Sequence, residues 1–469
     1  MNAKKIVIIG AVCTILSIGI IIHGIKKAKP SPVDILITQG TVITMDPQKK
    51  IIPNGAIAIK HDTIVAIGTS KDIAGQYAGK KVINAHDRVV LPGLINAHTH
   101  AAMTLFRGLA DDLSLMSWLQ KYIIPAEKKN VTEEFVYWGT ILGCYEMIKG
   151  GTTTFVDMYF FEDSVAQAAY EMSMRAIVGE TITDFSTPDS KTYKQALDYT
   201  RNFVKKWKHN KLITPAIAPH APYSCSKETL LAVQKFSQMH NIPLLTHLAE
   251  TKDEVQQIIT KHNKRPVAYL DSLGLLNEKL IAAHCIYLND AEITLLKQKN
   301  VGVVHAPTSN MKLGSGIARI YEFLKLGVFV GLGTDGAASN NSLDMFAEIK
   351  TAALLQKVGR EDPTALRAYQ ALELATISGA RAVHMENKIG SLEVGKKADI
   401  IVVAIDNIHQ IPVYNVISQL VYATKATDVQ TVIINGKIIM EDKVLGTQEQ
   451  EEELREKTEY FRSLIAKEK

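Results

Sequence analysis

Cysteine is scarce in this chain, and the cysteines that are present lie far apart. None of the four belongs to a C-x-x-C pair: Cys13, Cys144, Cys225 and Cys285. Their spacing excludes a zinc knuckle and the zinc site of cytidine-type deaminases, which needs a P-C-x-x-C element. We interpret the four thiols as core residues rather than as ligands or disulfide partners.

An excess of charge of one sign is also lacking. The formal net charge is only +5 over 469 residues, and several lysines that contribute to it lie near the first thirty positions. This balance argues against a nucleic-acid partner. Low-complexity tracts and repeats of solenoid period are absent as well. With 46% hydrophobic and 22% charged residues, the chain is long enough to bury a large core and to form more than one domain.

One long hydrophobic run stands at the start of the chain. Residues 6–25 read IVIIGAVCTILSIGIIIHGI, about the length needed to cross a bilayer as a helix. Lysines flank the run on both sides, and no small-residue cleavage site follows it. We therefore predict an uncleaved transmembrane anchor with the catalytic domain on the outer face. The alternatives are a secreted protein and one that faces the cytoplasm.

Hydrophobic periodicity divides the rest of the chain. Short strands separated by turn residues occur near both ends, and they predict a small β-sandwich built from the two ends. Between them, β-branched runs alternate with helical stretches, the pattern of a (β/α)8 TIM barrel. The predicted division is as follows: 1–29 membrane anchor, 30–91 first part of the sandwich, 92–388 barrel, 389–445 second part of the sandwich, and 446–469 C-terminal helix.

Polar residues end nearly every predicted barrel strand. In a TIM barrel the carboxyl ends of the strands form the face that carries the active site, so these side chains should gather at one mouth. In order of the strands they are His98 and His100, Asp157, Glu180, His220, His247 and Glu250, His284, His305 and Asp335.

A subset of these residues suits a single metal ion. His98 and His100 are two residues apart on one strand and should face the same side. His247 and Asp335 supply a third nitrogen and a carboxylate oxygen from strands across the mouth. This nitrogen-rich set favours zinc with room for a water molecule. No lysine follows strand four to bridge a second metal, so we predict one zinc per subunit.

The remaining polar groups suit hydrolytic removal of an amino group from a ring. Zinc lowers the pKa of a bound water to about 7, and Asp335 would accept its proton. Glu250 is placed to protonate a ring nitrogen, provided that an apolar pocket raises its pKa. His284 would orient the attacking oxygen and assist the departing ammonia.

Long motifs place these residues in a familiar order. The chain resembles the amidohydrolase superfamily, and within it the branch of 5'-methylthioadenosine/S-adenosylhomocysteine deaminases, from about residue 34 to about residue 440. The resemblance rests on NAHTHAAMTLFRGLADDL, FVDMYF, APHAPYSC, HLAET, AAHC, TSNMKLGSGIA and GTDGAASNNSLDMF.

This resemblance implies roles for further residues. It implies zinc at His98, His100, His247 and Asp335. It adds Glu127 as the carboxylate that grips the two ribose hydroxyls, His220 as a nucleoside contact and Trp118 as an apolar wall beside the base. The implied reaction converts methylthioadenosine, 5'-deoxyadenosine, adenosine or S-adenosylhomocysteine to the inosine analogue with release of ammonia. The chain could also form a homo-oligomer, and the sequence leaves this question open.

One departure from the family pattern concerns the end of strand three. Members of the branch resemble one another in placing arginines near this point to bind the carboxylate of a homocysteine tail. Here Glu180 stands at the position of the first arginine, and Lys191 is the only basic residue in the following loop. A carboxylate facing a carboxylate is repulsive, so the sequence predicts that a neutral or cationic 5' group is preferred.

Two other classes of function remain. One is an amidohydrolase that acts on another ring, such as guanine, cytosine or an s-triazine, and Glu127 argues against it because a bare base has no ribose. The other is a non-catalytic relative that keeps the barrel for binding, which the complete set of ligands together with Glu250 and His284 disfavours.

Overall fold

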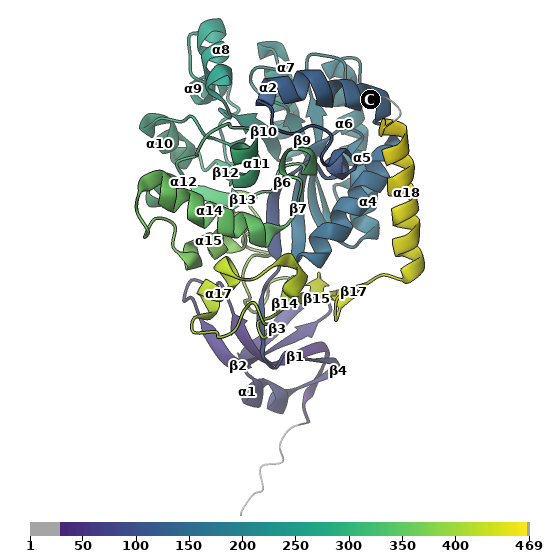
Figure 1. Ribbon diagram of the computed structural model, residues 1–469, viewed down its shortest axis with the longest axis vertical. Coiled ribbons are helices and arrows are strands. Elements are labelled where there is room, and N and C mark those ends of the chain that lie inside the picture. The colour runs from purple at the N-terminus through teal and green to yellow at the C-terminus, as the bar shows by residue number, and fades with distance from the viewer. Residues whose placement is uncertain (1–28, 467–469) are drawn as a thin grey trace, which may run out of the picture.

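The structure, a computed structural model, describes residues 29–466. Eight parallel strands follow one another around a nearly closed barrel (Figure 1), in the order in which they occur in the chain. They are β6 (Leu94–Thr99), β7 (Thr152–Tyr159), β8 (Arg175–Ile182), β9 (Ile213–Pro219), β10 (Leu244–Leu248), β11 (Leu280–His284), β12 (Gly302–His305) and β13 (Phe329–Leu332).

Most barrel strands are buried along their whole length. Such strands read as continuous apolar runs because helices cover one face and the barrel interior covers the other. The interior is filled by residues such as Ile95, Val156, Ile177, Leu245 and Ile281. A packed interior leaves the strand ends as the place for a site.

Helices surround the barrel and cover its mouth. Several begin at a side-chain cap, such as Thr132, Ser226 and Asn289, which accepts a hydrogen bond from the first turn. The helices are η1 (Ala101–Phe106), α2 (Leu115–Trp118), η2 (Leu119–Ile123), α3 (Ile124–Asn130), α4 (Glu133–Lys149), α5 (Glu162–Glu171), α6 (Tyr193–Trp207), α7 (Lys227–His240), α8 (Lys252–His262), α9 (Pro266–Ser272), α10 (Asp290–Gln298), α11 (Pro307–Lys312), α12 (Ile320–Lys325), α13 (Ala337–Asn340), α14 (Met345–Arg360), α15 (Ala368–Leu374) and α16 (Ile377–Ala382).

The two ends of the described chain form a second sheet below the barrel. Hydrogen bonds join nine strands in the order β17-β16-β15-β14-β5-β1-β2-β3, with β4 paired to β1. The strands are β1 (Ser31–Ile43), β2 (Ile51–Lys60), β3 (Thr63–Thr69), β4 (Tyr77–Asn84), β5 (Arg88–Pro92), β14 (Ile400–Ala404), β15 (Val429–Ile434), β16 (Lys437–Glu441) and β17 (Val444–Leu445). Helix α1 (Ser70–Gln76) lies between β3 and β4, and α17 (Val416–Tyr422) and η3 (Ala426–Asp428) lie between β14 and β15.

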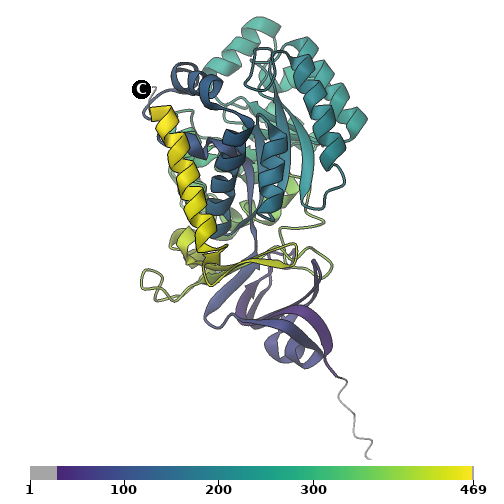
Figure 2. The same cartoon turned by 90° about the vertical axis from the view of Figure 1, so that its right-hand side faces the viewer.

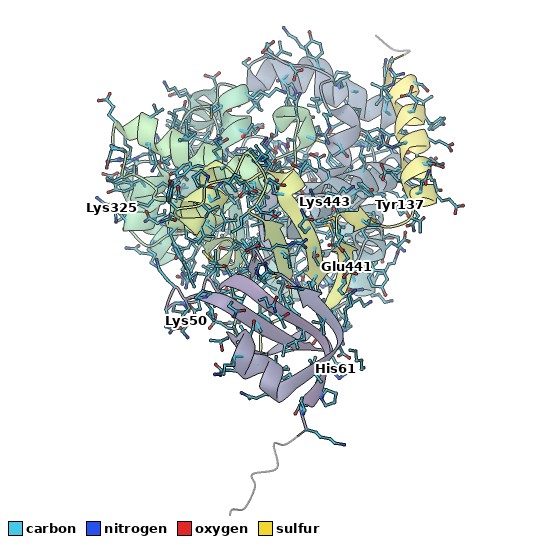
Figure 3. The ribbon with its side chains drawn as sticks, turned by 60° about the horizontal axis from the view of Figure 1, so that its bottom comes forward. Lys50, His61, Tyr137, Lys325, Glu441 and Lys443 are labelled. Carbon is cyan, nitrogen blue, oxygen red and sulfur yellow. The ribbon has the colours of Figure 1, made fainter. Side chains whose placement is uncertain are left out.

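The seam of this sheet is the antiparallel pair β5 and β14, which brings the early and late segments together. Glu441 of β16 also pairs with Lys81 of β4, with 2.7 Å between the charged atoms, and Figure 3 shows Glu441 beside the N-terminal strands. The prediction of a β-sandwich therefore needs one correction, because hydrogen bonds join all nine strands into a single sheet.

The nine-stranded sheet packs at the amino ends of the barrel strands. The backbone N–H of Gly93 donates to the carbonyl of Asp399, just before β14, and the side chains of Arg175 and Asp399 form a buried pair. The mouth of the barrel lies at the opposite, carboxyl end of the strands. The last helix, α18 (Gln448–Ala466), runs beside α4 on the outside of the barrel (Figure 2), where Phe461 packs on Phe135.

The transmembrane helix in the predicted fold class and the membrane-anchored location are both corrected by the structure. Within residues 29–466 no helix is both long and apolar enough to cross a bilayer. Residues 6–25, on which both predictions rested, lie outside the described part of the chain.

Candidate active site

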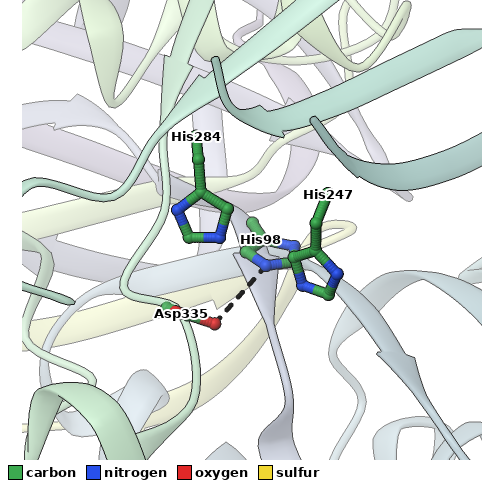
Figure 4. Close-up of side chains that lie close together, drawn as sticks. All are labelled: His98, His247, His284 and Asp335. Carbon is green, nitrogen blue, oxygen red and sulfur yellow. Dashed lines mark ion pairs between the residues drawn. The ribbon is translucent and has the colours of Figure 1, made fainter. Parts of the chain in front are cut away.

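Four ionisable side chains converge at the barrel mouth. His98, His247, His284 and Asp335 each offer a ligand atom, and these atoms lie within 4.8 Å of one another (Figure 4). They come from the ends of β6, β10 and β11 and from the turn after β13. All four side chains are buried. A cluster of this kind is costly unless the groups are paired or bind an ion.

His100 reaches the same point from just beyond β6. Its Nε2 lies 3.1 Å from Oδ1 of Asp335 and 3.4 Å from Nε2 of His247. The structure thus brings the four residues predicted as metal ligands into one cluster, and it places His284 in the cluster as well. Nε2 of His98 is buried and has no hydrogen-bond partner among the described residues, as expected of a nitrogen that is reserved for a metal ion.

The backbone fixes the ring orientation of two of these histidines. Nδ1 of His100 is 2.5 Å from the carbonyl oxygen of Met158, and Nδ1 of His247 is 2.8 Å from that of His220. A carbonyl oxygen only accepts hydrogen bonds, so each Nδ1 carries a proton and each Nε2 points into the cluster. This arrangement is typical of histidine ligands to metals.

The electrostatics of the cluster also suit a cation. Burial lowers the pKa of His98 to about 4 and that of His247 well below its usual range. For His100, burial is outweighed by the hydrogen bond and charge of Asp335, which raise its pKa to about 9. The histidines around Asp335 in turn hold its pKa well below its usual range. A metal ion would take the place of the proton that His100 holds.

Glu250 lies beside this cluster, two residues beyond the end of β10. It is buried, and burial raises the pKa of its carboxyl. Its Oε2 is 3.7 Å from Nε2 of His284, and its Oε1 accepts a hydrogen bond from Ser315. A raised pKa favours the protonated form of a carboxyl, which is the direction that a general acid requires.

A cavity opens directly above these groups. It contains about 680 Å³ of atom-free space, part of it open to solvent. His100, His247, His284, Glu250 and Asp335 line its floor. The three predicted substrate contacts, Glu127, His220 and Trp118, also line it.

Glu127 enters the cavity from α3. Its carboxylate accepts a hydrogen bond of 2.9 Å from the hydroxyl of Tyr159, at the end of β7. Burial outweighs this hydrogen bond and raises the pKa of Glu127 to about 7. His220 stands nearby with Nδ1 2.9 Å from Oγ of Ser224. Trp118 is buried, and its indole N–H has no partner among the described residues.

A second hollow, here termed the outer chamber, continues outward from the cavity. The two share Leu119, Glu127, Phe160, His220 and Tyr223 as lining residues. Beyond these, the outer chamber is lined by apolar side chains, by two exposed charged ones, Asp184 and Lys261, and by the uncharged polar residues Gln120, Thr183, Ser224 and Gln257. Lys261 is the single lysine or arginine among the described residues that line it.

Glu180 does not face either space, which corrects the prediction about its role. Successive residues of a strand point to opposite faces, and it is its neighbour Thr181 that lines the cavity. Glu180 is buried, with Oε2 accepting from the backbone N–H of Glu162. Burial and the nearby Asp189 raise its pKa well above the usual range. Because Glu180 points away from both spaces, it does not face a substrate carboxylate there.

Several residues that shape the site were not predicted from the sequence. Tyr159 is one of them, and its hydroxyl donates a hydrogen bond to Glu127. Ser309, Asn310 and Ser315 hydrogen-bond the polar groups of the mouth. Only their position in the sequence could have indicated a role in the site, because they follow β12 closely within the motif TSNMKLGSGIA. His305, which ends β12, is buried with neither ring nitrogen partnered within residues 29–466.

Comparisons with known proteins agree with this architecture. The amidohydrolase family pattern matches residues 89–439, and the chain therefore belongs to the amidohydrolase family. A relative from Syntrophobacter fumaroxidans, named 5-methylthioadenosine/S-adenosylhomocysteine deaminase, is 49% identical over 417 residues, which are 89% of this chain and 95% of the relative.

Two solved structures extend the comparison. An adenosine deaminase from Xanthomonas campestris with bound zinc is 38% identical, has a TM-score of 0.91, and is matched over 93% of this chain and 100% of its own. An atrazine chlorohydrolase from Arthrobacter aurescens complexed with zinc is 22% identical with a TM-score of 0.83, covering 91% of this chain and 100% of its own. At that identity the second structure supports the fold alone.

Proposed function

We propose that this chain is a zinc-dependent deaminase that converts an adenosine-type nucleoside to the inosine analogue and ammonia. One observation carries the proposal: a single cavity contains a buried metal-ligand cluster, a carboxyl with a raised pKa at Glu250, and a second carboxyl, that of Glu127, in its lining. The names of the 49% identical relative and of the 38% identical structure agree with it.

The residues of the cluster fit a zinc ion. His98, His100, His247 and Asp335 offer three imidazole nitrogens and one carboxylate oxygen, the donor types that zinc prefers. Nε2 of His98 makes no hydrogen bond among the described residues and lies 3.4 Å from Oδ1 of Asp335, which supports this fit. Zinc held there supplies a Lewis acid that lowers the pKa of a water molecule to about 7. One zinc ion per chain satisfies the set.

The protein's own groups account for the proton transfers. Asp335 has its pKa held low, so it is ionised and able to accept the proton of the attacking water. Glu250 has a raised pKa and donates its proton to a ring nitrogen, which makes the adjacent carbon electrophilic. His284, 3.7 Å from Glu250, orients the attacking oxygen and passes a proton toward the departing amine.

The substrate's remaining parts fit the walls of the two spaces. Glu127 accepts hydrogen bonds from the ribose hydroxyls, His220 contacts the nucleoside, and Trp118 forms a wall beside the base. The 5' substituent extends into the outer chamber, since that chamber begins at Glu127 and His220. The apolar part of its lining, such as Met116 and Phe185, suits a methylthio group, and Lys261 offers a partner for the carboxylate of a homocysteine tail.

A panel of substrates tests this proposal. The zinc-loaded chain is assayed for ammonia release from methylthioadenosine, 5'-deoxyadenosine, adenosine and S-adenosylhomocysteine, and from guanine, cytosine and an s-triazine. We expect turnover of the adenosine derivatives and none of the bare rings. Turnover confined to guanine, cytosine or the triazine would overturn the nucleoside assignment. If the protein binds one zinc per chain but turns over none of these compounds, the result would favour a binding role.

A further inference from the structure

One short segment of the chain touches three of the groups that the mechanism uses. It comprises α11 and the turn after it, residues 307–315, and we term it the strand-seven segment because it follows β12, the seventh barrel strand. Its side chains reach groups held by the fifth, sixth and eighth strands. The contacts are Ser309 Oγ to Asp335 Oδ2 at 2.7 Å, Asn310 Oδ1 to His284 Nδ1 at 2.8 Å and Ser315 Oγ to Glu250 Oε1 at 3.1 Å.

The segment itself is firmly held. Ser309, Asn310 and Ser315 are all buried. The backbone N–H of Ser315 donates to the carbonyl of Asn310 at 2.8 Å, which closes the turn, and that of Thr308 donates to Glu348 of α14. A segment that is buried and hydrogen-bonded in this way can fix the rotamers of the side chains it contacts.

Each contact has a definite chemical effect. The amide oxygen of Asn310 only accepts, so Nδ1 of His284 carries a proton and Nε2 faces Glu250. The hydroxyl of Ser315 donates to one oxygen of Glu250, which leaves the other oxygen as the place for the transferable proton. The hydroxyl of Ser309 donates to Oδ2 of Asp335, and this directs Oδ1 toward His98 and His100.

We propose that the strand-seven segment is a positioning element of the catalytic site, in which Ser309, Asn310 and Ser315 set the orientation of Asp335, His284 and Glu250. The inference rests on the proposed deaminase function and deepens it. None of these three residues lines the cavity, so each acts through its partner and not by binding substrate. Loss of one contact should therefore lower kcat and leave KM nearly unchanged.

Two pairs of variants test the proposal. Asn310→Leu removes the acceptor while Asn310→Asp keeps one, and Ser315→Ala removes the donor while Ser315→Thr keeps one. We expect Asn310→Leu and Ser315→Ala to lower kcat for methylthioadenosine by about 10 to 100-fold, the usual effect of losing a partner of a catalytic group or ligand. The conservative variants Asn310→Asp and Ser315→Thr should keep most of the kcat of the unaltered chain. Met311→Ala is the matched control, since Met311 lies on the same helix and its side chain is exposed.

Readouts other than turnover separate positioning from damage to the fold. In each variant we expect one zinc per chain, a cooperative thermal transition well above the assay temperature, and an unchanged dissociation constant for the inosine-analogue product, measured by calorimetry. A variant that loses inosine binding and zinc together with activity would overturn the proposal, because the segment would then simply hold the site together.

A double-mutant cycle gives the sharpest test. If Ser315 acts through Glu250, Ser315→Ala should change the residual kcat of Glu250→Ala by less than about twofold. An equal loss in both backgrounds would contradict the inference while the deaminase assignment stands. Failure of the unaltered chain to deaminate any nucleoside would instead remove the proposed function itself.

Discussion

The backbone N–H of Asp335 donates a hydrogen bond of 3.0 Å to the carbonyl oxygen of His98. This bond joins the end of the first barrel strand to the turn after the last one, and so closes the barrel at its mouth. It also holds the two side chains close to each other, with Nε2 of His98 3.4 Å from Oδ1 of Asp335. The same hydrogen bond therefore contributes both to closing the barrel and to holding the metal-ligand cluster together.

Metal removal should abolish activity reversibly. A chelator is expected to remove about one zinc per chain, because a single cluster of ligands was found among the described residues. Re-addition of Zn²⁺ should restore turnover, whereas Mg²⁺ should not, since Mg²⁺ prefers an all-oxygen shell. Metal analysis alongside ammonia release measures both. Full activity in metal-free protein would contradict the account.

The pH dependence of ribose binding should follow Glu127. Its pKa is raised to about 7, so the carboxyl gains a proton as the pH falls through that value and loses its capacity to accept two hydrogen bonds. We expect kcat/KM for adenosine to fall below about pH 7 relative to that for 2',3'-dideoxyadenosine, which lacks the hydroxyls. Glu127→Gln should remove this difference between the two substrates. A ratio that is independent of pH in the unaltered chain would exclude the assigned role.

Tyr159 should matter for the same contact. Its hydroxyl donates to Glu127 at 2.9 Å, so Tyr159→Phe leaves the carboxylate without a partner and free to rotate. A lost hydrogen bond to a charged group is worth about 1.5–3 kcal/mol, and the effect should appear in kcat/KM for adenosine. For 2',3'-dideoxyadenosine the loss should be small. Equal losses for both substrates would show that Tyr159 does not act through ribose.

Lys261 should discriminate between 5' substituents. Its side chain lines the outer chamber and is exposed, so a contact with a homocysteine carboxylate is worth at most about 1 kcal/mol. Lys261→Met is expected to lower kcat/KM for S-adenosylhomocysteine about fivefold without affecting methylthioadenosine. Lys264→Met is the matched control, because Lys264 is exposed nearby and lines neither space. An equal kcat/KM for S-adenosylhomocysteine in the two variants would show that Lys261 does not bind the homocysteine carboxylate.

The junction between barrel and sheet should depend on Arg175 and Asp399. The guanidinium contacts both carboxylate oxygens, at 2.8 and 3.1 Å, and both side chains are buried. Asp399→Ala leaves a buried charge unpaired and should lower the free energy of unfolding by about 3–5 kcal/mol. Glu459→Ala, which breaks an exposed pair with Arg462, should cost less than about 1 kcal/mol. Urea denaturation measures both, and similar costs would contradict the prediction.

The barrel and the members of its mouth could be predicted because both leave local signals. Apolar strands that run directly into histidine, as at His98, His247 and His284, identify strand ends without any knowledge of the fold. Glu180 could not be interpreted in the same way. A shift of one residue along a strand reverses the direction of a side chain, and the sequence does not say which of Glu180 and Thr181 faces inward.

The positioning contacts could not be predicted from the sequence for a different reason. Ser309 and Asp335 are 26 positions apart, and Glu250 and Ser315 are 65 apart. Such contacts depend on how a loop folds across neighbouring strands. The anchor and the outer location were inferred from the hydropathy of residues 6–25 and from the residues that flank this run, and no described element supports them.

The most direct test of the central claim follows the two products together. Zinc-loaded protein is mixed with methylthioadenosine, and ammonia and the inosine analogue are measured in the same sample, beside a Glu250→Gln variant of equal zinc content. The account predicts one ammonia per inosine analogue and a rate about 10²–10⁴-fold lower in the variant, the typical contribution of a general acid. Equal rates in both proteins, or no inosine analogue from either, would contradict it.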